Sequence, residues 1–396
     1  MNIVVCEPQC WGFEHALFNA ALLKTVLLAY PEAKLTYLGE HEHLEWVRAY
    51  LDEHAGNLTN RMECRAIPIP KPDYAHWGYF TPRGFREELR WYRLAHQLIA
   101  DTSAALFLIT SITNPGLLAV KLSMYAERSQ VPTIVIPHSI LMLVLNKHPL
   151  KKLRSNLYGF RGVLKLPQPE QLRYIALGGS IYSHLSAAEP KLAAYFRSLD
   201  PPYLWQRGYP LVNTVAGEKI RFGFFGVGFK GFDQFAQLAR EIVPQAANVE
   251  FTLVGYLNRP TDPQVYIGAV NGVTEQPLST DEFSRRAASL AYSVWCADPQ
   301  RYRLAASVSF IDSLSFGKPG IYLNNPYIAH YFERMGDIGY LCDSLAEMQE
   351  AILSILRHFP TDRYRQQCEN IQRERHIFEP ETLAPQFRSI AESLSR

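Results

Sequence analysis

An alternation of apolar strands and helices, begun twice along the chain, is the feature that most constrains the fold. Residues 3–6 predict a buried strand, and after a loop that contains Gly12 the stretch 14–30 predicts a helix. The same order begins afresh over 220–243, where a predicted strand, a glycine-rich turn and a helix follow one another. Strands that alternate with helices build parallel sheets with helices on both faces. We therefore expect an α/β chain with two Rossmann-like domains.

The length of the chain agrees with two domains. At about 100–200 residues per domain, a chain of 396 residues has room for two. The stretch 200–217 is rich in proline and glycine, and this composition is typical of a connection between domains. We place the two domains at 1–205 and 206–378. Just before the connection, 189–199 predicts a further helix.

Composition excludes several classes of protein. The formal net charge is only +2, and no nucleic-acid recognition motif is present. The six cysteines are scattered, without a CxxC pair or zinc spacing, which predicts reduced structural thiols and no metal site. The N-terminus lacks the basic start of a signal peptide, and no apolar run reaches the ~20 residues that cross a bilayer. We expect a cytoplasmic protein.

Residues 141–166 carry six basic and no acidic residues, interleaved with leucine, tyrosine and phenylalanine. A basic and apolar segment of this kind can lie on an anionic membrane surface. The alternative is a solvated basic helix that packs on its own sheet. The complete lack of acids favours contact with a membrane or with an anionic lipid-linked molecule.

The stretch 307–328 predicts a short amphipathic helix, a break, an apolar strand and a polar loop. Gly317 suits the end of the helix because glycine takes positive φ without a steric clash, and Pro319 prevents the helix from continuing. A polar turn at 324–326 then ends the strand. Ligands of open α/β sheets collect at the carboxyl ends of the strands. This stretch therefore predicts one wall of a ligand cleft.

Two segments resemble nucleotide-sugar glycosyltransferases of the GT-B fold, and they are similar to the group 1, or family 4, type. The run 312–319 resembles the acidic helix and Gly-Lys-Pro segment of that family, with Asp312 at the position of the acid that binds the donor ribose. The glycine-rich turn 226–233 resembles the turn that opens the donor domain of these enzymes. Lys230 stands there at the position of a basic residue that holds the donor diphosphate.

The resemblance implies a fold of two Rossmann-like domains that face each other across a cleft. The domain 1–205 would bind the acceptor, and the domain 206–378 would bind the nucleotide-sugar donor. A last helix, within 379–396, would return to the N-terminal domain. Two positions depart from the family, because residues 227–228 stand where an arginine is usual and Leu304 stands where a second acid is usual.

The implied activity is that of a glycosyltransferase, similar to hexosyltransferases. It would move a sugar from a UDP- or GDP-linked donor to a hydroxyl acceptor, on a lipid-linked molecule or a glycan precursor, as in polysaccharide biosynthesis. Lys230 and the amides around Gly226 and Gly228 would hold the diphosphate, so neither a divalent metal nor another cofactor is expected. The other implied donor ligands are Asp312 for the ribose, Ser309 and Phe310 for the diphosphate, and Asn325 and Tyr327 for the sugar.

The N-terminal half offers candidates for a catalytic base. GT-B enzymes often place a histidine after a strand of the N-terminal sheet, and His138 follows the predicted strand 131–136. If the enzyme inverts, His138 is the first candidate, and Glu14 and His15 are next. Gly12, in the same loop as Glu14, lets the backbone approach a ligand. The alternative for His138 is a residue that merely caps its strand.

Two other functions stay open at this point. A GT-B sugar-nucleotide epimerase would use the same donor pocket without an acceptor. A non-catalytic GT-B partner subunit would account for the missing arginine and for Leu304. The expected partners are a nucleotide sugar and a glycan or lipid-linked acceptor, with peripheral membrane contact through 141–166 and no nucleic acid. The expected location is the cytoplasm, at the inner face of the membrane.

Overall fold

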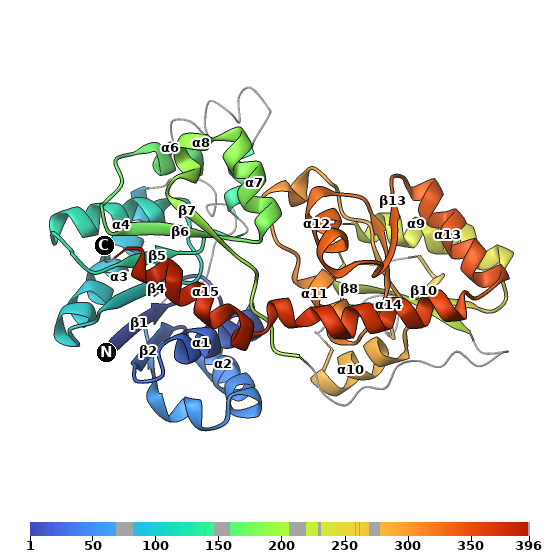
Figure 1. The fold of residues 1–396 in the computed structure, drawn as a ribbon, viewed down its shortest axis with the longest axis horizontal. Coiled ribbons are helices and arrows are strands. Elements are labelled where there is room, and N and C mark those ends of the chain that lie inside the picture. Colours follow the sequence, from blue (N-terminus) through green and yellow to red (C-terminus); the bar gives the residue numbers. More distant parts are fainter. Residues whose placement is uncertain are drawn as a thin grey trace. The chain divides into compact units, whose positions relative to one another are not determined.

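The computed structural model describes residues 1–68, 82–138, 140–145, 159–205, 219–228, 231–257, 259–260, 262–268 and 278–394. The chain forms two compact units, each built around its own sheet (Figure 1). Unit 1 comprises Met1–Leu204, Leu304–Ala306 and Ile377–Arg396, and unit 2 comprises Trp205–Arg303 and Ser307–His376.

The sheet of unit 1 is parallel between all of its described strands, in the order β3-β2-β1-β4-β5-β6-β7. Its strands are β1 (Asn2–Cys6), β2 (Lys34–Gly39), β3 (Met62–Ala66), β4 (Leu106–Ile109), β5 (Thr133–Val135), β6 (Leu172–Leu177) and β7 (Phe196–Leu199). The strand order reverses beside β1. In open α/β sheets, ligands bind outside the carboxyl ends of the strands at such a reversal.

Helices cover both faces of this sheet. They are α1 (Ala16–Ala29), α2 (His41–His54), α3 (Pro82–Asp101), α4 (Asn114–Ala126), α6 (Phe160–Lys165), α7 (Gly179–Ala188), α8 (Pro190–Ala193) and α15 (Pro380–Glu392), with short turns η1 (Gly56–Arg61) and η2 (Leu141–Leu145). Ile3 and Val5 share one core with α1, α2 and the fully buried Leu383 of α15. On the other face, His96 of α3 packs against Phe107 of β4, with ring centroids 6.0 Å apart.

Strand β7 differs from the prediction for its part of the chain. The sequence predicts a helix over 189–199, but α8 is short, and Phe196–Leu199 forms an edge strand that pairs with β6. Phe196 stacks on Tyr174 of β6, with ring centroids 4.8 Å apart. Aromatic residues pack well on the pleated surface of a sheet, so this buried pair favours a strand. The prediction of a helix was therefore wrong in the second half of this stretch.

The sheet of unit 2 is also parallel, in the order β10-β9-β8-β11-β12-β13. Its strands are β8 (Ile220–Val227), β9 (Val249–Tyr256), β10 (Val265–Tyr266), β11 (Tyr292–Trp295), β12 (Gly320–Leu323) and β13 (Gly339–Cys342). The order reverses beside β8, the strand that opens the unit. The turn after β8 therefore lies at the edge where a ligand site is expected.

Both faces of this second sheet are buried. Its helices are α9 (Phe232–Ile242), α10 (Thr280–Ser289), α11 (Val308–Ser315), α12 (Pro326–Met335), α13 (Leu345–Arg357) and α14 (Thr361–Glu374), with short turns η3 (Val243–Gln245), η5 (Arg301–Arg303) and η6 (Arg375–Phe378). Phe224 packs into the core with α9 and α13, whereas Phe225 packs with Phe316 on the opposite side. Successive side chains of a strand point to opposite faces, so β8 contributes to both layers.

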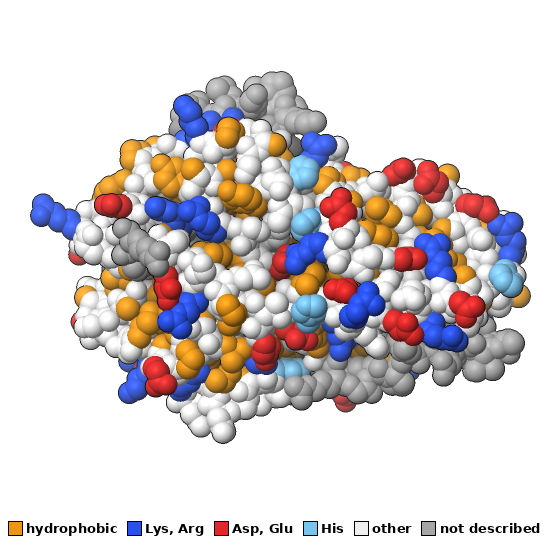
Figure 2. Space-filling model, viewed as in Figure 1, with side chains coloured by type: hydrophobic (Ala, Val, Ile, Leu, Met, Phe, Trp, Pro, Cys, Tyr) orange, Lys and Arg blue, Asp and Glu red, His pale blue; other side chains and the backbone are white. Residues whose placement is uncertain are grey.

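The surface of unit 2 carries charges of both signs. Basic and acidic side chains are interspersed over the region of α13 and α14 (Figure 2). Several of them pair, as Arg363 does with Asp337 at 2.9 Å and Arg373 with Glu374 at 2.7 Å. Among the helices that the structure describes, none has the length and apolar character that a membrane span requires. All six cysteines are free thiols, as their scattered spacing predicts.

Candidate functional site

The carboxyl end of β8 and the start of α11 lie against each other in unit 2. Gly226 has a φ of +98°, and a Cβ built on it would lie 2.8 Å from the Oγ of Ser309. Gly231, which directly precedes α9, has a φ of +107° and abuts the backbone of Cys296, just after β11. Glycines therefore allow the loops that follow β8 and β11 and the start of α11 to meet closely. Lys230, the predicted diphosphate ligand, lies outside the described residues.

Helix α11 presents two of the predicted donor ligands, Ser309 and Asp312, on one face. Ser307 caps the helix, because its hydroxyl accepts a hydrogen bond from the N–H of Phe310 at 3.2 Å. Ser309 and Asp312 are three positions apart and both are partly exposed, so they share the same face of the helix. Phe310 is fully buried on the other side. Its N–H donates to the capping hydroxyl of Ser307, and its ring lies in the core.

The Gly-Lys-Pro segment is structural in this chain. Gly317 has a φ of +65°, as expected for a residue that ends a helix. The side chain of Lys318 is fully buried, and its Nζ donates to the carbonyl oxygen of Ala288 at 2.8 Å. Burial lowers the pKa of Lys318 to about 8. This lysine therefore ties α11 and β12 to the end of α10 rather than facing solvent.

The predicted sugar ligands lie at the start of α12. The side-chain oxygen of Asn325 accepts from the N–H groups of Tyr327 at 3.0 Å and Ile328 at 3.1 Å, which caps the helix. Tyr327 is fully buried, and its ring lies against Phe310 and Tyr331. The ring of Tyr327 therefore belongs to an aromatic core, whereas Asn325 reaches the surface of a pocket.

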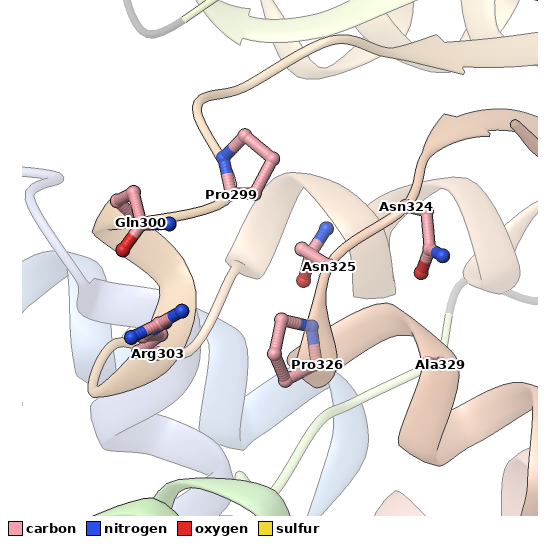
Figure 3. Close-up of a pocket in the computed structure, with 7 residues that line it drawn as sticks. All are labelled: Pro299, Gln300, Arg303, Asn324, Asn325, Pro326 and Ala329. Carbon is pink, nitrogen blue, oxygen red and sulfur yellow. The ribbon is translucent and has the colours of Figure 1, made fainter. Parts of the chain in front are cut away.

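This pocket lies between the loop after β11 and the turn between β12 and α12 (Figure 3). It has a volume of about 300 Å³, and it is lined by Pro299, Gln300, Arg303, Asn324, Asn325, Pro326 and Ala329. Gln300 and Arg303 stand on one wall, opposite Asn325 and Pro326 (Figure 3). Of these residues, the sequence prediction named only Asn325. Arg303 directly precedes Leu304, the position at which the sequence departs from the expected acid.

In unit 1, two of the predicted catalytic residues come together. The rings of His15, at the start of α1, and His138, beyond β5, lie 4.9 Å apart between centroids. Phe18 of α1 also packs against His138, with ring centroids 5.4 Å apart. His15 has a φ of +52°, a left-handed conformation that is uncommon for a residue other than glycine. Glu14 precedes His15 in the same loop and is partly exposed.

The loop that carries these residues is held by α2. Gly12 has a φ of +51°, and its N–H donates to the Glu40 carboxylate at 3.4 Å. The carbonyl oxygen of Gly12 lies 2.8 Å from Nδ1 of His43, which must donate because a carbonyl oxygen can only accept. Nε2 of His43 in turn lies 3.0 Å from the amide of Asn19. Gly12 is therefore engaged by the protein itself on both sides of its backbone.

Glu7 is the buried centre of this arrangement, and the sequence prediction did not name it. Its carboxylate is fully buried and accepts hydrogen bonds from the N–H groups of Gln9 and Cys10, the amide of Asn19, and the hydroxyls of Thr110 and Ser111. Burial alone would raise the pKa of Glu7. The nearby His43 and these hydrogen bonds outweigh burial and hold the pKa below its ordinary value. Glu7 thus joins β1, α1 and the end of β4.

A second acid that the sequence prediction did not name lies at the same end of the sheet. Glu88 of α3 accepts a hydrogen bond from the hydroxyl of Thr113, the cap of α4, at 2.8 Å. Burial raises the pKa of Glu88 to about 7. Within the described residues, no group of three His, Cys, Asp or Glu side chains is arranged to hold a metal ion.

We expect Gly226→Ala to destabilise the chain by about 2 kcal/mol, because the new Cβ combines an unfavourable φ with a contact against Ser309. Chemical denaturation measures this loss. Gly56→Ala is the matched control, since Gly56 has a φ of +54° with nothing within 4 Å of its Cβ position. The free energy of unfolding of the control should fall by only about 1 kcal/mol. Equal losses in the two variants would show that the contact with Ser309 contributes nothing.

Two parallel α/β units, each with a strand reversal beside its opening strand, define the GT-B fold, which confirms the fold predicted from the sequence resemblance. The Anabaena protein Alr3699/HepE, solved with UDP and glucose, matches with a TM-score of 0.61 and 14% identity over 99% of each chain.

Two further solved structures share this fold. A glycosyltransferase from Rickettsia africae ESF-5 has a TM-score of 0.62 and 8% identity, and the match covers 100% of this chain and 99% of that one. The glycotransferase of kitacinnamycin has a TM-score of 0.53 and 13% identity, over 99% of this chain and 98% of that one. No protein-family description and no curated protein matches the chain.

Proposed function

We propose that this chain is a glycosyltransferase that moves a hexosyl group from a nucleoside diphosphate sugar to a hydroxyl acceptor. The observation that carries the proposal is the meeting of Gly226 and Ser309, with Asp312 on the same face of α11, at the carboxyl edge of the unit 2 sheet. A glycine turn at the carboxyl end of a strand suits a diphosphate, and a partly exposed carboxylate suits ribose hydroxyls. The solved GT-B relatives support this choice of ligand, because HepE was crystallised with UDP and with UDP-glucose.

The donor site works by binding the charge that develops on the leaving diphosphate. Lys230 supplies positive charge at that position, and backbone N–H groups of the turn 226–231 supply hydrogen-bond donors. The N–H of Gly228 is not one of these donors, because it donates to the carbonyl oxygen of Tyr256 at 2.7 Å. We propose that these groups take the place of a divalent metal. Asp312 fixes the ribose, and Ser309 supports the diphosphate. Asn325, whose side chain caps α12, contributes to the wall that receives the sugar.

The acceptor hydroxyl needs a group that removes its proton. His138 and His15 supply two imidazoles at the carboxyl ends of β5 and β1, and Glu14 adds a carboxylate beside them. An imidazole can accept a proton in this step. The acceptor is a glycan precursor or a lipid-linked molecule, and the basic stretch 141–166 brings the enzyme to an anionic membrane surface. Residues 146–158 of that stretch lie outside the described part of the chain.

A binding panel tests this function. The purified full chain is titrated with UDP, GDP, ADP and CDP, and with the corresponding sugar nucleotides, by thermal shift and by calorimetry. Nucleotides of one base should bind to the chain. The sugar nucleotide of that base should be consumed only when an acceptor is supplied. Consumption without an acceptor would indicate an epimerase or a hydrolase instead. Binding of no nucleotide would overturn the proposed function.

Lys230→Ala should lower turnover of the donor by about 10–100-fold, because a charged hydrogen bond to a leaving phosphate contributes about 1.5–3 kcal/mol. Initial rates at saturating acceptor measure this effect. Lys219→Ala is the control, since Lys219 is an exposed lysine directly before β8 in the same unit. Unchanged rates for Lys230→Ala would remove Lys230 from the site.

A further inference from the structure

The pocket beside α12 differs in charge from the surface around it. Its lining contains three side-chain amides, two prolines, one alanine and a single charged residue, Arg303. No Asp or Glu lines it. A guanidinium is charged at every physiological pH, so the pocket carries one permanent positive charge. Amides that can bind hydroxyls, together with one cation, suit a polar ligand that carries one negative group.

Arg303 has no carboxylate partner among the described residues. The other arginines of unit 2 are commonly paired, as Arg240 is with Asp262 at 3.1 Å and Arg221 with Glu250 at 3.0 Å. Asp298 is the acid nearest to Arg303 in the preceding sequence, and its carboxylate accepts from the N–H of Gln300 at 2.9 Å instead. Arg303 is partly buried. A partly buried cation that faces a pocket without an acid is stabilised by an anion that comes from outside.

The remaining lining groups favour a sugar as the carrier of that anion. The side chain of Gln300 makes none of the hydrogen bonds found within the described residues, so its amide is available to hydroxyls. Asn324 donates to Asp343 at 2.7 Å and keeps its carbonyl oxygen for a ligand. The volume of about 300 Å³ is at the small end for ligand pockets and suits one sugar ring better than a whole nucleotide.

We infer that this pocket receives a sugar that carries a carboxylate, a uronic acid unit, and that Arg303 selects it. The inference rests on the proposed function, because the sugar is taken to be that of the nucleotide donor. A guanidinium binds a carboxylate through two parallel hydrogen bonds, which adds geometric selection to charge. A phosphate group carries more charge than the one cation of this pocket matches.

The test compares three ligands on the full chain by calorimetry: the nucleoside diphosphate, its glucose conjugate and its glucuronate conjugate, with UDP and GDP series run in parallel. The glucuronate conjugate should bind at least about 10-fold more tightly than the glucose conjugate. Arg303→Gln should abolish this preference and leave the affinity for the free diphosphate unchanged. Arg303→Lys, which keeps the charge without the planar fork, should keep part of the preference.

Arg357→Gln is the control, because Arg357 lies on α13 in an ion pair with Glu350, outside the pocket. It should bind all three ligands as the parent chain does. Equal affinity for glucose and glucuronate conjugates in the parent chain would overturn the inference while the proposed function stands. Weaker binding of the free diphosphate by Arg303→Gln would also overturn it, since Arg303 would then be a phosphate ligand. Binding of no nucleotide at all would overturn the proposed function and the inference together.

Discussion

Replacing Glu7 with alanine should lower the free energy of unfolding by about 3–5 kcal/mol, which is a large part of the stability of an ordinary domain. The substitution removes the acceptor of two N–H groups, two hydroxyls and one amide that are held at the end of β1. Each buried donor left without an acceptor costs about 1–3 kcal/mol, and relaxation of the loop recovers part of this. Chemical denaturation monitored by circular dichroism measures the loss.

The control for this experiment is Glu63→Ala. Glu63 is an exposed glutamate on β3 that pairs with Arg65 at 2.6 Å, so its loss should change stability by no more than about 0.5 kcal/mol. If Glu7→Ala unfolds at the same denaturant concentration as the control, the buried carboxylate does not stabilise the fold.

The contribution of Glu7 should also depend on pH in a defined direction. Its folded pKa lies below the ordinary value of 4.5, so the folded chain favours the ionised form. The stabilisation is therefore present above that ordinary value and is lost as the pH falls through the folded pKa. The difference in stability between the parent chain and Glu7→Gln should be constant near neutrality and should shrink in acid. A difference that grows in acid would contradict this assignment.

Replacing Asp312 with asparagine should weaken binding of the nucleoside diphosphate by about 10–100-fold. This change in affinity corresponds to the free energy of one hydrogen bond to a charged group. Asn keeps the shape of Asp but loses the charge and one acceptor. If Asp312 accepts from the ribose, the parent chain should prefer the ribonucleotide to its 2′- and 3′-deoxy forms. Asp312→Asn should lose most of this preference. Calorimetric titration with the three nucleotides measures both effects.

Asp281→Asn is the matched control, because Asp281 is an exposed aspartate in the first turn of α10 in the same unit. It should bind all three nucleotides as the parent chain does. If Asp312→Asn weakens every nucleotide equally and keeps the preference for ribose, the carboxylate acts on another part of the ligand or only on the fold of α11.

Most of the fold follows from local patterns. The strand at 220–227 and the helix after it were predictable because an apolar run, a glycine turn and an amphipathic helix occur in order. Ser279 and Ser344 each cap a helix, because the serine hydroxyl accepts a hydrogen bond from the N–H of the glutamate three residues on, a spacing that is visible in the sequence. Strand β7 was not predictable in this way, because four residues hold too little periodicity. Its pairing with β6 decides its conformation.

The candidate site also has parts that could be predicted from the sequence and parts that could not. Ser309 and Asp312 share a helix face, and a spacing of three residues is visible in a sequence. The Arg303 pocket needs two loops that are more than twenty residues apart, and only the fold of unit 2 brings them together. The contacts of Glu7 with Thr110 and Ser111 span a hundred residues for the same reason. An acid directly after a buried strand was the one local signal that could have pointed to Glu7.

The position of α15 has a consequence for synthesis of the chain. This helix packs in the core of unit 1, although all of unit 2 is translated before it. Unit 1 therefore lacks the helix that contributes the buried Leu383 and Phe387 until after unit 2 has been translated. Until then the groove beside α1 is an exposed apolar surface, the kind that chaperones bind. Helix α15, which follows unit 2 in the sequence, thus completes the core of unit 1, which precedes unit 2.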